Sequence, residues 1–533
     1  MVWAFMCCES ISSKNIDDIT GAGLQNDNKK IAFRVDASLL IGTGHLMRCL
    51  TLADALKQFG INSCFVSRHM PIHLRDLLVS KGHEFKLLSA MHNDSAISHL
   101  AHAKWLGVPQ KCDAQDTIDA LFGQSWDWLI VDHYGLDIHW ESALRRAVGQ
   151  IMVIDDIADR QHDCDVLVDQ NLYEEMNSRY SDKVPKDCRL LLGPRYALLR
   201  EKFRQLREQI KPNRGVVKNI LVFFGGVDAD NYTGRVIEAL SAMDVSALHV
   251  NVVIGAQQPY REQIEVACKR YGFICHVQID RMAELMVEAD LSIGAGGGAT
   301  WERCCLGLPA LVLSTADNQK KQLTDAAKRG LVYAPDVDGD IENFVTRHVI
   351  ALIENPSLRN FLSANGMQAV DARGALRIIN ALGNSSIEMR VATIDDSRDL
   401  FNWRNDPAIR AFSRNTESIA WHDHQHWLNA VLTDPSRILL VGLVQDMPVG
   451  VVRYDLEEKS AEISIYLVPD KFSSGLGTEL LLAAEMWLRK KLPMVRSIHA
   501  HVLGGNERSM RLFDSAGYAS ELTRFTKRLK QDE

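Results

Sequence analysis

The stretch DASLLIGTGHLMRCLTLADALKQFG, residues 36–60, decides the fold class near the start of the chain. It follows the apolar run IAFRV, crosses a turn that contains Gly42 and Gly44, and continues with apolar residues at helical spacing. This order predicts a buried strand, a glycine turn and an amphipathic helix, the repeating unit of an open parallel sheet. Asp36 ends the expected strand at the edge where ligands of such sheets bind, so we expect it to contact a substrate.

His45 is the candidate general base of this turn. It falls in the first turn of the expected helix, where the positive end of the helix dipole disfavours imidazolium and keeps the ring able to accept a proton. Gly42 and Gly44 let a substrate approach the backbone closely, and Arg48 shares the helix face of His45. The alternative is a histidine that only caps the turn, but its place in the first half of a two-lobed fold favours catalysis.

Two series of alternating strand-like and helix-like segments follow one another, and a third part differs. The first series covers residues 30–210 and the second covers residues 211–384. Such alternation predicts an α/β protein with two doubly wound, Rossmann-like lobes. Residues 385–533 show adjacent strands, a glycine loop and one long helix, which predicts an α+β domain, and residues 1–29 are expected to form a loose extension.

Composition argues against several classes of partner. The 533 residues carry a net charge of −8 without a block of Lys and Arg, so we expect no nucleic-acid groove. No uncharged apolar run is long enough to cross a membrane, and the first residues lack the basic leader of a signal peptide. The eleven cysteines form no CxxC pair, which favours reduced thiols in a cytoplasmic protein and gives no reason to expect a metal site.

Two glycine loops follow strands of the second series. The loop with Gly226 comes after NILVFF, and the loop GAGGG at residues 294–298 comes after DLSI and leads into ATWERCC. Free amides at the start of that helix suit a diphosphate, and Glu302, one turn into the helix, is placed to reach ribose hydroxyls. The alternative is that the glycines only allow close packing of the helix on the strand.

Several segments of the first two series resemble a known enzyme family. They are, in order, RVDASLLIGTGHLMRCLTLADAL, WDWLIVDHYGLD, IDDIADRQHDCDVLVDQN, LLGPRYALLR, FFGGVDADNYT and GAGGGATWERCCLGLPALVLSTADNQ. Over roughly residues 30–380 they resemble the UDP-sugar hydrolase of pseudaminic acid biosynthesis, a family similar in fold to the two-lobed GT-B glycosyltransferases. The resemblance implies hydrolysis of UDP-2,4-diacetamido-2,4,6-trideoxy-β-L-altropyranose to the free sugar and UDP.

The same resemblance implies roles for individual residues. His45 is then the base that activates water for attack on the anomeric carbon, and UDP leaves as a stabilised anion without a strong general acid. The residues expected to contact the sugar are Asp36, Gly44, Arg48, Tyr134, Asn318 and Gln319. Those expected to bind UDP are Gly226, Ile279, Met282, Gly297, Gly298, Ala299, Thr300 and Glu302, with Ile279 and Met282 at the uracil. Tyr134 as a core aromatic residue at a strand end is an equally weighted alternative.

The third part resembles the acetyltransferase superfamily named for GCN5 over nearly all of residues 388–531. A loop with consecutive amides suited to the pyrophosphate of acetyl-CoA joins the strand AEISIYLVP to a long helix, and it consists of Ser473, Ser474, Gly475, Leu476, Gly477 and Thr478. The resemblance implies a backbone contact of the pantetheine arm at Leu467 and places Asn506 and Ser509 near the thiol. Phe513 stands where many members have the tyrosine that protonates the thiolate.

These features predict a bifunctional enzyme whose partners are small molecules, namely UDP-sugars and acetyl-CoA. The natural pairing is with the acetyltransferase that acts just upstream in the same pathway, on the 4-amino group of UDP-4-amino-4,6-dideoxy-N-acetyl-β-L-altrosamine. Two alternatives stay open at this point. In the first, the two lobes form a glycosyltransferase that uses a sugar acceptor in place of water. In the second, the C-terminal part is a protein N-acetyltransferase or a degenerate nucleotide-sugar binding module.

Overall fold

The computed structural model describes residues 29–38, 40–89, 100–176, 178–210, 215–243, 248–315, 317–337, 340–383, 387–413, 415–444, 446–469, 476–503 and 505–521. Apart from Lys29, the extension expected at residues 1–29 lies outside this part of the chain. The chain divides into two compact units, one of Asn28–Ile378 and one that contains Ile379–Glu533.

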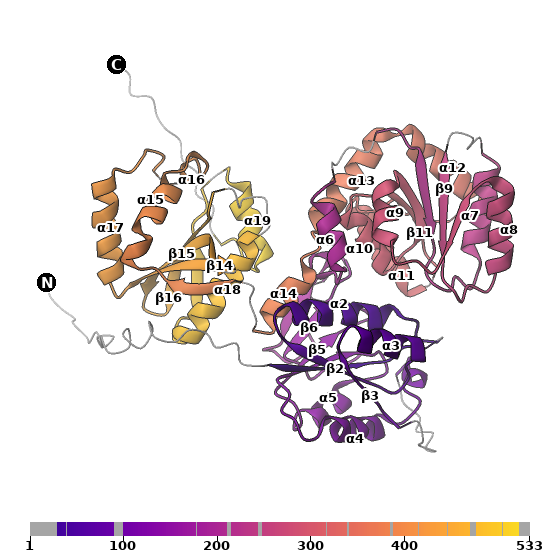
Figure 1. Ribbon diagram of the computed structural model, residues 1–533, viewed down its shortest axis with the longest axis horizontal. Helices are drawn as coiled ribbons and strands as arrows, with labels where there is room; N and C mark the ends of the chain where they lie inside the picture. Colours follow the sequence, from indigo (N-terminus) through magenta and orange to yellow (C-terminus); the bar gives the residue numbers. More distant parts are fainter. Residues whose placement is uncertain are drawn as a thin grey trace. The chain divides into compact units, whose positions relative to one another are not determined.

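A seven-stranded parallel sheet forms the first lobe of the larger unit (Figure 1). Its strands are β1 (Lys30–Val35), β2 (Asn62–Ser67), β3 (Glu84–Leu87), β4 (Trp128–Asp132), β5 (Gln150–Ile154), β6 (Val166–Asp169) and β7 (Arg189–Leu192). They lie in the order β3-β2-β1-β4-β5-β6-β7, and all neighbouring pairs are parallel. The central strands β1 and β4 are largely apolar and almost entirely buried, as expected for a parallel sheet with helices on both faces.

The helices of this lobe cover both faces of the sheet. They are α2 (Gly44–Gln58), α3 (Ile72–Ser80), α4 (Gln110–Leu121) and α5 (Ile138–Leu144), with 3₁₀ turns at Ala103–Trp105 and Pro194–Tyr196. In Figure 1, α2 and α4 lie on opposite sides of the sheet. The apolar core under α4 and α5 includes Leu121, Leu129 and Trp140. This cover leaves the carboxyl ends of the strands as the place where a ligand can bind.

The second lobe contains a five-stranded parallel sheet of order β10-β9-β8-β11-β12. Its strands are β8 (Asn219–Phe223), β9 (His249–Ile254), β10 (Ile274–Val277), β11 (Leu291–Ala295) and β12 (Ala310–Leu313). Its helices are α6 (Glu201–Arg207), α7 (Tyr232–Ser241), α8 (Arg261–Tyr271), α9 (Met282–Glu288), α10 (Gly298–Cys305), α11 (Asp317–Lys328), α12 (Ile341–Glu354) and α13 (Pro356–Ala369). The helix that follows, α14 (Gly374–Ala381), returns to the first lobe, where Arg377 donates to the carbonyl of Arg195 at 2.7 Å (Figure 1). Two apolar cores lie on the two faces of the sheet, one under α7, α8 and α12 and the other under α6, α9 and α10 (Figure 1).

The boundary between the lobes differs from the one predicted at residues 210–211. Phe203 of α6 is completely buried and lies in the same apolar core as Met286 and Trp301 of the second lobe. Leu199, just before α6, belongs to that core as well. The helix therefore packs with the second lobe, although its sequence directly continues the first series, because its apolar face completes the core there.

The C-terminal unit is built on a five-stranded mixed sheet. The strands are β13 (Glu388–Val391), β14 (Arg437–Val444), β15 (Met447–Glu457), β16 (Ser460–Leu467) and β17 (Ser497–Ala500), in chain order. They pair antiparallel except for β16 and β17, which are parallel. The helices are α15 (Ser397–Asn405), α16 (Pro407–Arg410), α17 (Trp421–Thr433), α18 (Leu476–Lys491) and α19 (Glu507–Ser515), after a 3₁₀ turn at Ile394–Asp396.

The predicted fold class is confirmed. Two Rossmann-like lobes, the composition of a GT-B fold, form the first unit, and an α+β domain follows. The division at Ile378–Ile379 falls within α14 and precedes the joint that we predicted at residues 384–385, which lies outside the described residues.

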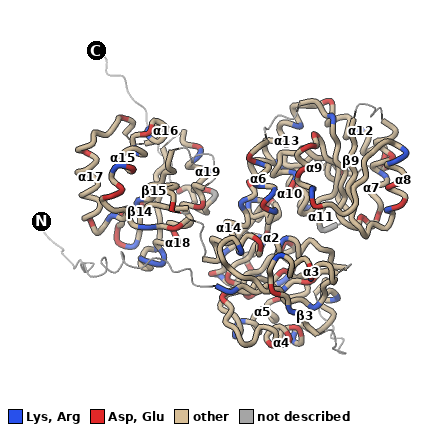
Figure 2. Tube along the Cα trace, viewed as in Figure 1, with Lys and Arg blue, Asp and Glu red and all other residues tan. Residues whose placement is uncertain are grey.

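Charged residues of both signs are interspersed along the helices of both units (Figure 2). Among the described residues, no helix is both long and apolar enough to span a membrane. In the same part of the chain, no three His, Cys, Asp or Glu side chains form a group suited to a metal ion.

His162 of the first lobe is a buried cation between two carboxylates. Its Nδ1 lies 2.7 Å from Oε1 of Glu141, and its Nε2 lies 3.8 Å from Oδ2 of Asp155. Burial lowers the pKa of His162, but Glu141 and Asp155 outweigh burial and raise the pKa from 6.5 to about 9. Because the folded-state pKa is raised, the pairing stabilises the fold below the unfolded-state pKa, and this contribution is lost as the pH rises through about 9.

We therefore expect the larger unit to lose stability as the pH rises from about 6.5 to about 9. His162→Gln should remove this part of the pH dependence. Denaturant unfolding of the full chain at a series of pH values gives the slope of the free energy of unfolding against pH for the parent protein and for the variant. Equal slopes in the parent protein and the variant would contradict the assignment of charge to His162.

Candidate active site

Each lobe of the larger unit places its candidate loops at the switch point of its sheet. In the first lobe, the turn with Gly42 follows β1 and the turn with Tyr134 follows β4, and β1 and β4 are neighbours. In the second lobe, the loop with Gly226 follows β8 and the loop with Gly297 follows β11, and these strands are neighbours too. Ligands of open α/β sheets bind outside the carboxyl ends of the strands at this point, so each lobe has one candidate site.

His45 is oriented by a carboxylate that the sequence analysis did not single out. It is the second residue of α2, it is almost buried, and its Nδ1 lies 2.6 Å from Oδ1 of Asp132, the last residue of β4. Burial alone would raise the pKa of Asp132, but the charges of Arg48 and His45 lower it well below its ordinary value. The ionised carboxylate accepts a hydrogen bond from Nδ1, which leaves the lone pair of Nε2 to accept a proton.

Arg48 joins two carboxylates beside His45. Its Nε and Nη2 donate to the two oxygens of Asp132, each at 2.6 Å, and its Nη1 donates to Oδ2 of Asp156 at 2.9 Å. This two-point pairing fixes the plane of the Asp132 carboxylate. The structure thus places Arg48 beside His45, where it holds Asp132, and its contact with the sugar stays a prediction.

An aromatic group covers one side of the His45 ring. Tyr134 packs edge to face on His45 with ring centroids 4.6 Å apart, and it stacks on Trp105 at 5.4 Å. The Tyr134 hydroxyl donates a hydrogen bond to Oδ1 of Asp156. Burial and the Asp156 charge together raise the pKa of Tyr134 well above its ordinary value, so the phenol stays protonated. The structure therefore brings Tyr134 and His45 together, with Tyr134 largely buried.

Asp36 anchors the turn after β1 from within the protein. Its side chain is completely buried, and its Oδ1 accepts hydrogen bonds from Nη1 of Arg34 at 2.7 Å, Oγ of Ser67 at 2.8 Å and the backbone N–H of Arg68 at 2.7 Å. Burial would raise the pKa of Asp36, but Arg34 and His133 lower it well below its ordinary value. These contacts hold the turn to β2 and leave Asp36 without access to the surface, where a sugar would bind.

Gly226 and Gly298, one in each glycine loop of the second lobe, have open space around them. Gly297 precedes α10 with φ at +78°, in the left-handed region that favours glycine. A Cβ built on Gly226 or Gly298 would meet no atom within 4 Å. The Gln319 side chain lies against this loop, with its Oε1 3.0 Å from a Cβ built on Gly296. Gln319 and the expected diphosphate loop are therefore brought together.

A buried arginine lies beside the same loop. Arg303 of α10 is 1% exposed, and its Nη2 donates to the carbonyl of Ala295 at 2.6 Å and to Oγ1 of Thr300 at 3.4 Å. Its Nε and Nη1 have no hydrogen-bond partner among the described residues. Burial lowers the pKa of Arg303 to about 10, so the guanidinium is charged at neutral pH. A buried cation with unused donors next to free helix amides favours an anionic ligand.

The other residues expected at the nucleotide differ in their exposure. Glu302 is partly exposed, lies 3.8 Å from Nη2 of Arg200, and has its pKa raised by burial. Met282 is buried in the core of the lobe, and Ile279 packs against that core while remaining partly exposed. Asn318 lies in α11, but its side chain is outside the described part of the structure.

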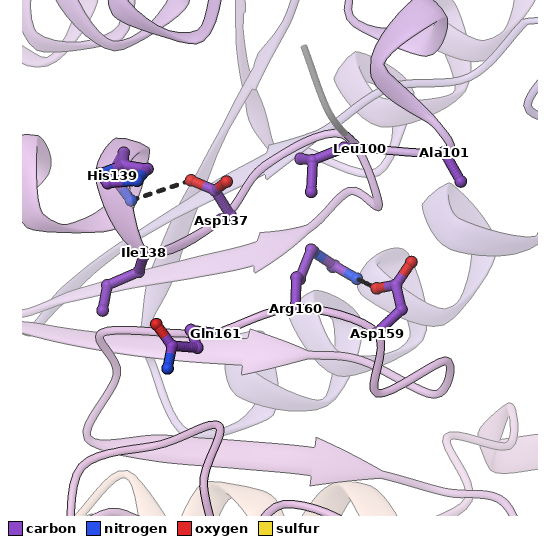
Figure 3. A pocket seen from close by; sticks show the side chains of 8 residues that line it. All are labelled: Leu100, Ala101, Asp137, Ile138, His139, Asp159, Arg160 and Gln161. Carbon is purple, nitrogen blue, oxygen red and sulfur yellow. Dashed lines mark hydrogen bonds and ion pairs between the residues drawn. The ribbon is translucent and has the colours of Figure 1, made fainter.

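A pocket of about 310 Å³ lies in the first lobe beside this site (Figure 3). Its lining consists of Leu100, Ala101, Asp137, Ile138, His139, Asp159, Arg160 and Gln161. Arg160 donates to Asp159 at 2.9 Å, and its guanidinium lies 5.7 Å from the centroid of the Tyr134 ring. Arg160 therefore borders both the pocket and the aromatic group beside His45. The pocket contains none of the residues predicted from the sequence.

The C-terminal sheet has the splay expected of an acetyl-CoA site. β16 and β17 pair from Ser460 opposite Ser497 to Ile463 opposite Ala500, whereas β16 continues to Leu467 beside β15. The backbone of residues 464–467 therefore has no partner in β17. The N–H and C=O groups of this segment that face away from β15 have no strand partner among the described residues and are available to an extended ligand arm.

The start of α18 lies close to the end of the splayed strand. Leu476, Gly477 and Thr478 form its first turn, and Ser473, Ser474 and Gly475 lie outside the described residues. A Cβ built on Gly477 would lie 3.9 Å from the Leu467 side chain and 3.5 Å from that of Leu512 in α19, which are ordinary contact distances. The helix start and Leu467 are therefore neighbours, as a shared acetyl-CoA site requires.

The remaining residues predicted for this site have structural partners. Oδ1 of Asn506 accepts the backbone N–H of Ser509 at 3.1 Å and caps α19. Phe513 is buried in the domain core, where its ring packs edge to face on Tyr518 at 5.0 Å. Glu462 is a candidate from the sequence for proton handling in the acetyl transfer, with a solvated strand carboxylate as the alternative, and its Oε1 lies 3.1 Å from Nδ1 of His501.

Asp132, Asp156 and Asn171 are site residues that the sequence analysis missed. They end or follow β4, β5 and β6, which are successive strands of one parallel sheet. The rule that selected Asp36 at the end of β1 applies equally to them. The signal was present in the quoted segments WDWLIVDHYGLD and IDDIADRQHDCDVLVDQN, but the partner of His45 lies 87 residues away in sequence.

Comparisons with known proteins match the C-terminal part of the chain to one family and nearly the whole chain to one relative. Residues 386–519 match the family described as Acetyltransferase (GNAT) domain. The chain is 26% identical over 515 residues to the uncharacterised protein MJ1062 of Methanocaldococcus jannaschii, covering 92% of this chain and 96% of that protein.

Two shorter relatives have names that refer to carbohydrate metabolism. The chain is 24% identical over 302 residues to the UDP-2,4-diacetamido-2,4,6-trideoxy-β-L-altropyranose hydrolase of Campylobacter jejuni, covering 56% of this chain and 97% of that protein. It is 23% identical over 342 residues to the spore coat polysaccharide biosynthesis protein SpsG of Bacillus subtilis, covering 63% of this chain and 93% of that protein. The chain thus carries a GNAT domain at its C-terminus and an N-terminal region homologous to these proteins.

Proposed function

We propose that this protein acetylates and then hydrolyses a UDP-linked amino sugar. The C-terminal domain transfers an acetyl group from acetyl-CoA to the 4-amino group of UDP-4-amino-4,6-dideoxy-N-acetyl-β-L-altrosamine. The two-lobed unit then hydrolyses UDP-2,4-diacetamido-2,4,6-trideoxy-β-L-altropyranose to the free sugar and UDP. The relative from Campylobacter jejuni and the matched GNAT domain support this choice of substrates.

The observation that carries the proposal is the contact of His45 with Asp132 at the switch point of the first lobe. With Nδ1 donating to the carboxylate, Nε2 takes a proton from water while the water oxygen attacks the anomeric carbon. The bond from that carbon to the diphosphate oxygen breaks, and UDP leaves with the electron pair. Asp132 stabilises the imidazolium that results, as the aspartate does in other Asp-His pairs.

On the second lobe, the α10 start and Arg303 are suited to the diphosphate. The amides of Gly298 and Ala299 lie at the helix start, and the buried guanidinium of Arg303 adds a positive charge nearby. Both features stabilise negative charge as it develops on the leaving UDP. Because UDP is stabilised as an anion, the proposed mechanism requires no separate general acid.

In the acetyl transfer, the unprotonated 4-amino nitrogen attacks the thioester carbonyl carbon. The C–S bond then breaks, coenzyme A leaves as a thiolate that takes up a proton, and the amine loses one. The splayed edge of residues 464–467 and the α18 start support binding of the pantetheine arm and the pyrophosphate.

A reaction with the 4-amino UDP-sugar as substrate tests the proposed sequence of steps. NMR should show no free sugar until acetyl-CoA is added, then an N-acetylated UDP-sugar, and then free diacetamido sugar with UDP. Acetylation of peptides in place of the amino sugar would favour a protein N-acetyltransferase instead. UDP release that requires an added sugar acceptor would favour a glycosyltransferase.

Glu302→Ala should raise KM for the UDP-sugar about 10- to 100-fold with little change in kcat, because a ribose contact made equally in ground and transition states is uniform binding. The expected loss is about 1.5–3 kcal/mol, the range for hydrogen bonds to charged groups. Glu342→Ala is a matched control. Glu342 also lies in the second lobe and pairs with an arginine, Arg235, just as Glu302 pairs with Arg200. Steady-state kinetics decide, and a fall in kcat at unchanged KM would move Glu302 into the chemistry.

A further inference from the structure

Asn171 is a buried side chain whose amide connects the two lobes of the larger unit. It follows β6 of the first lobe, and its Oδ1 accepts hydrogen bonds from Nε1 of Trp301 at 3.1 Å and from Nε2 of Gln322 at 2.9 Å. Its Nδ2 donates to Oδ2 of Asp156 at 3.2 Å. The amide oxygen thus accepts one hydrogen bond from α10 and one from α11, and the amide nitrogen donates one to the residue that follows β5 by two positions.

The two donors to Asn171 belong to the helices that carry the candidate ligand residues of the second lobe. Trp301 comes directly after Thr300 in α10, whose start forms the expected diphosphate site. Gln322 lies in α11, three residues after Gln319, which lies against the glycine loop. Any shift of α10 or α11 relative to the first lobe therefore acts directly on Asn171.

On the other side, Asp156 leads to the candidate base. Oδ2 of Asp156 also accepts from Nη1 of Arg48, and Oδ1 accepts from the Tyr134 hydroxyl. Arg48 pairs with both oxygens of Asp132, and Asp132 holds Nδ1 of His45. One continuous series of hydrogen bonds between described side chains thus runs from the second-lobe helices to the ring of His45.

Breaking this series at Asn171 would leave buried groups without partners. The indole of Trp301 is 1% exposed and has a single donor, so it cannot turn to water when its acceptor is removed. Asp156 would lose one of its three donors, which changes the position of Arg48. Such displacements matter because an error of about 1 Å in a catalytic group can lower a rate about 100-fold.

We infer that Asn171 is a positioning residue that couples nucleotide binding on the second lobe to the placement of His45 through Asp156, Arg48 and Asp132. This inference rests on the proposed function of His45 and goes beyond it by assigning the link between the lobes. When the Asn171 side chain is removed, UDP still binds, but the first-lobe site is no longer held in the geometry that the reaction needs.

The test compares Asn171→Leu with the parent protein, both as the full chain. Leu has the same branched heavy-atom skeleton as Asn, with two methyl groups in place of the amide oxygen and nitrogen. The expected kcat for UDP release from the diacetamido UDP-sugar is about 10- to 100-fold lower, and the dissociation constant for UDP changes less than about threefold. Hydrogen–deuterium exchange supplies a second readout. UDP should slow exchange in both α10 and the first turn of α2 in the parent protein, and only in α10 in the variant.

Gln170→Met is the matched control, because Gln170 is a buried amide in the same segment whose Oε1 accepts only the backbone N–H of Leu198 among the hydrogen bonds of the described residues. It should keep the UDP-dependent slowing in α2. Gln322→Met removes one of the two donors to Oδ1 of Asn171 and leaves Asn171 in place. If Asn171→Leu does not fold, Gln322→Met tests the coupling with the same kinetic and exchange measurements. It should show a smaller loss in the same direction.

The inference is overturned if α2 is slowed equally by UDP in the parent protein and in Asn171→Leu, or if α2 does not respond to UDP in the parent protein. It is also overturned if Gln170→Met reproduces the kinetic and exchange changes, since these would then report general destabilisation. If the parent protein binds UDP and releases none from UDP-sugars, the proposed hydrolysis fails, and the exchange measurement still decides whether Asn171 couples the lobes.

Discussion

Replacing His45 with Asn is expected to lower the turnover number for UDP-sugar hydrolysis by about two to four orders of magnitude, the usual contribution of a general base. Asn retains an amide donor for Asp132, so the support formed by Asp132 and Arg48 stays in place. It offers no basic nitrogen at the position of Nε2. UDP affinity, measured by calorimetry, should change less than about threefold, because the nucleotide loops lie on the second lobe.

His83→Asn is the matched control for this substitution. His83 is also a buried histidine next to a carboxylate, with Nε2 3.0 Å from Oδ1 of Asp54, and it lies between α3 and β3, away from the site. Its replacement should leave hydrolysis unchanged. A His45→Asn protein that keeps a tenth of the parental turnover with unchanged UDP binding would remove His45 from the role of base.

Gly477→Glu should abolish acetyl transfer, with a loss in kcat/KM of at least about 100-fold. Gly477 lies in the first turn of α18, where a pyrophosphate approaches the free amides. Two like charges 4 Å apart repel by about 4 kcal/mol near a protein surface, which accounts for a loss of this size. Hydrolysis of a pre-acetylated UDP-sugar should continue at the parental rate, because that site belongs to the other unit.

Gly477→Ala separates charge from steric effects at the same position. A Cβ there meets only ordinary contacts with Leu467 and Leu512, so the alanine protein should acetylate the 4-amino UDP-sugar at close to the parental rate. A coupled thiol assay for coenzyme A release measures all three proteins. Acetylation by Gly477→Glu at a third of the parental rate or more would contradict the placement of the pyrophosphate at α18.

Local sequence patterns were sufficient to predict the order of strand, glycine turn and helix around His45. The position of His45 in the first turn of α2 follows from the order of apolar residues and glycines around it. The three-part division also followed from the change in pattern along the chain. These features depend on neighbouring residues, which is why they were accessible without coordinates.

The side chains that support the site could not be assigned in the same way. Asp132 reaches His45 of α2 from the end of β4, and Asn171 contacts Trp301 from 130 residues away. Such pairs depend on strand order and on the packing of one lobe against the other. For the same reason Asp36 was predicted to contact a substrate, although its carboxylate is completely enclosed by Arg34, Ser67 and Arg68.

Packing also changed the assignment of α6. Its sequence continues the first series without a break, yet Phe203 fills the core of the second lobe. Amphipathic spacing shows that a helix buries one face, but it does not identify the surface that receives it. The division between the lobes could therefore be predicted only approximately.

The most direct test of the central claim is the fate of the water oxygen in the reaction of the two-lobed unit. The full-length protein is incubated with UDP-2,4-diacetamido-2,4,6-trideoxy-β-L-altropyranose in water enriched in oxygen-18, without acetyl-CoA and without a sugar acceptor, and both products are analysed by mass spectrometry. Attack of a water activated by His45 on the anomeric carbon predicts that the label enters the free sugar and that UDP carries none. Label in the phosphate of UDP, or no free sugar until an acceptor is added, would contradict the account.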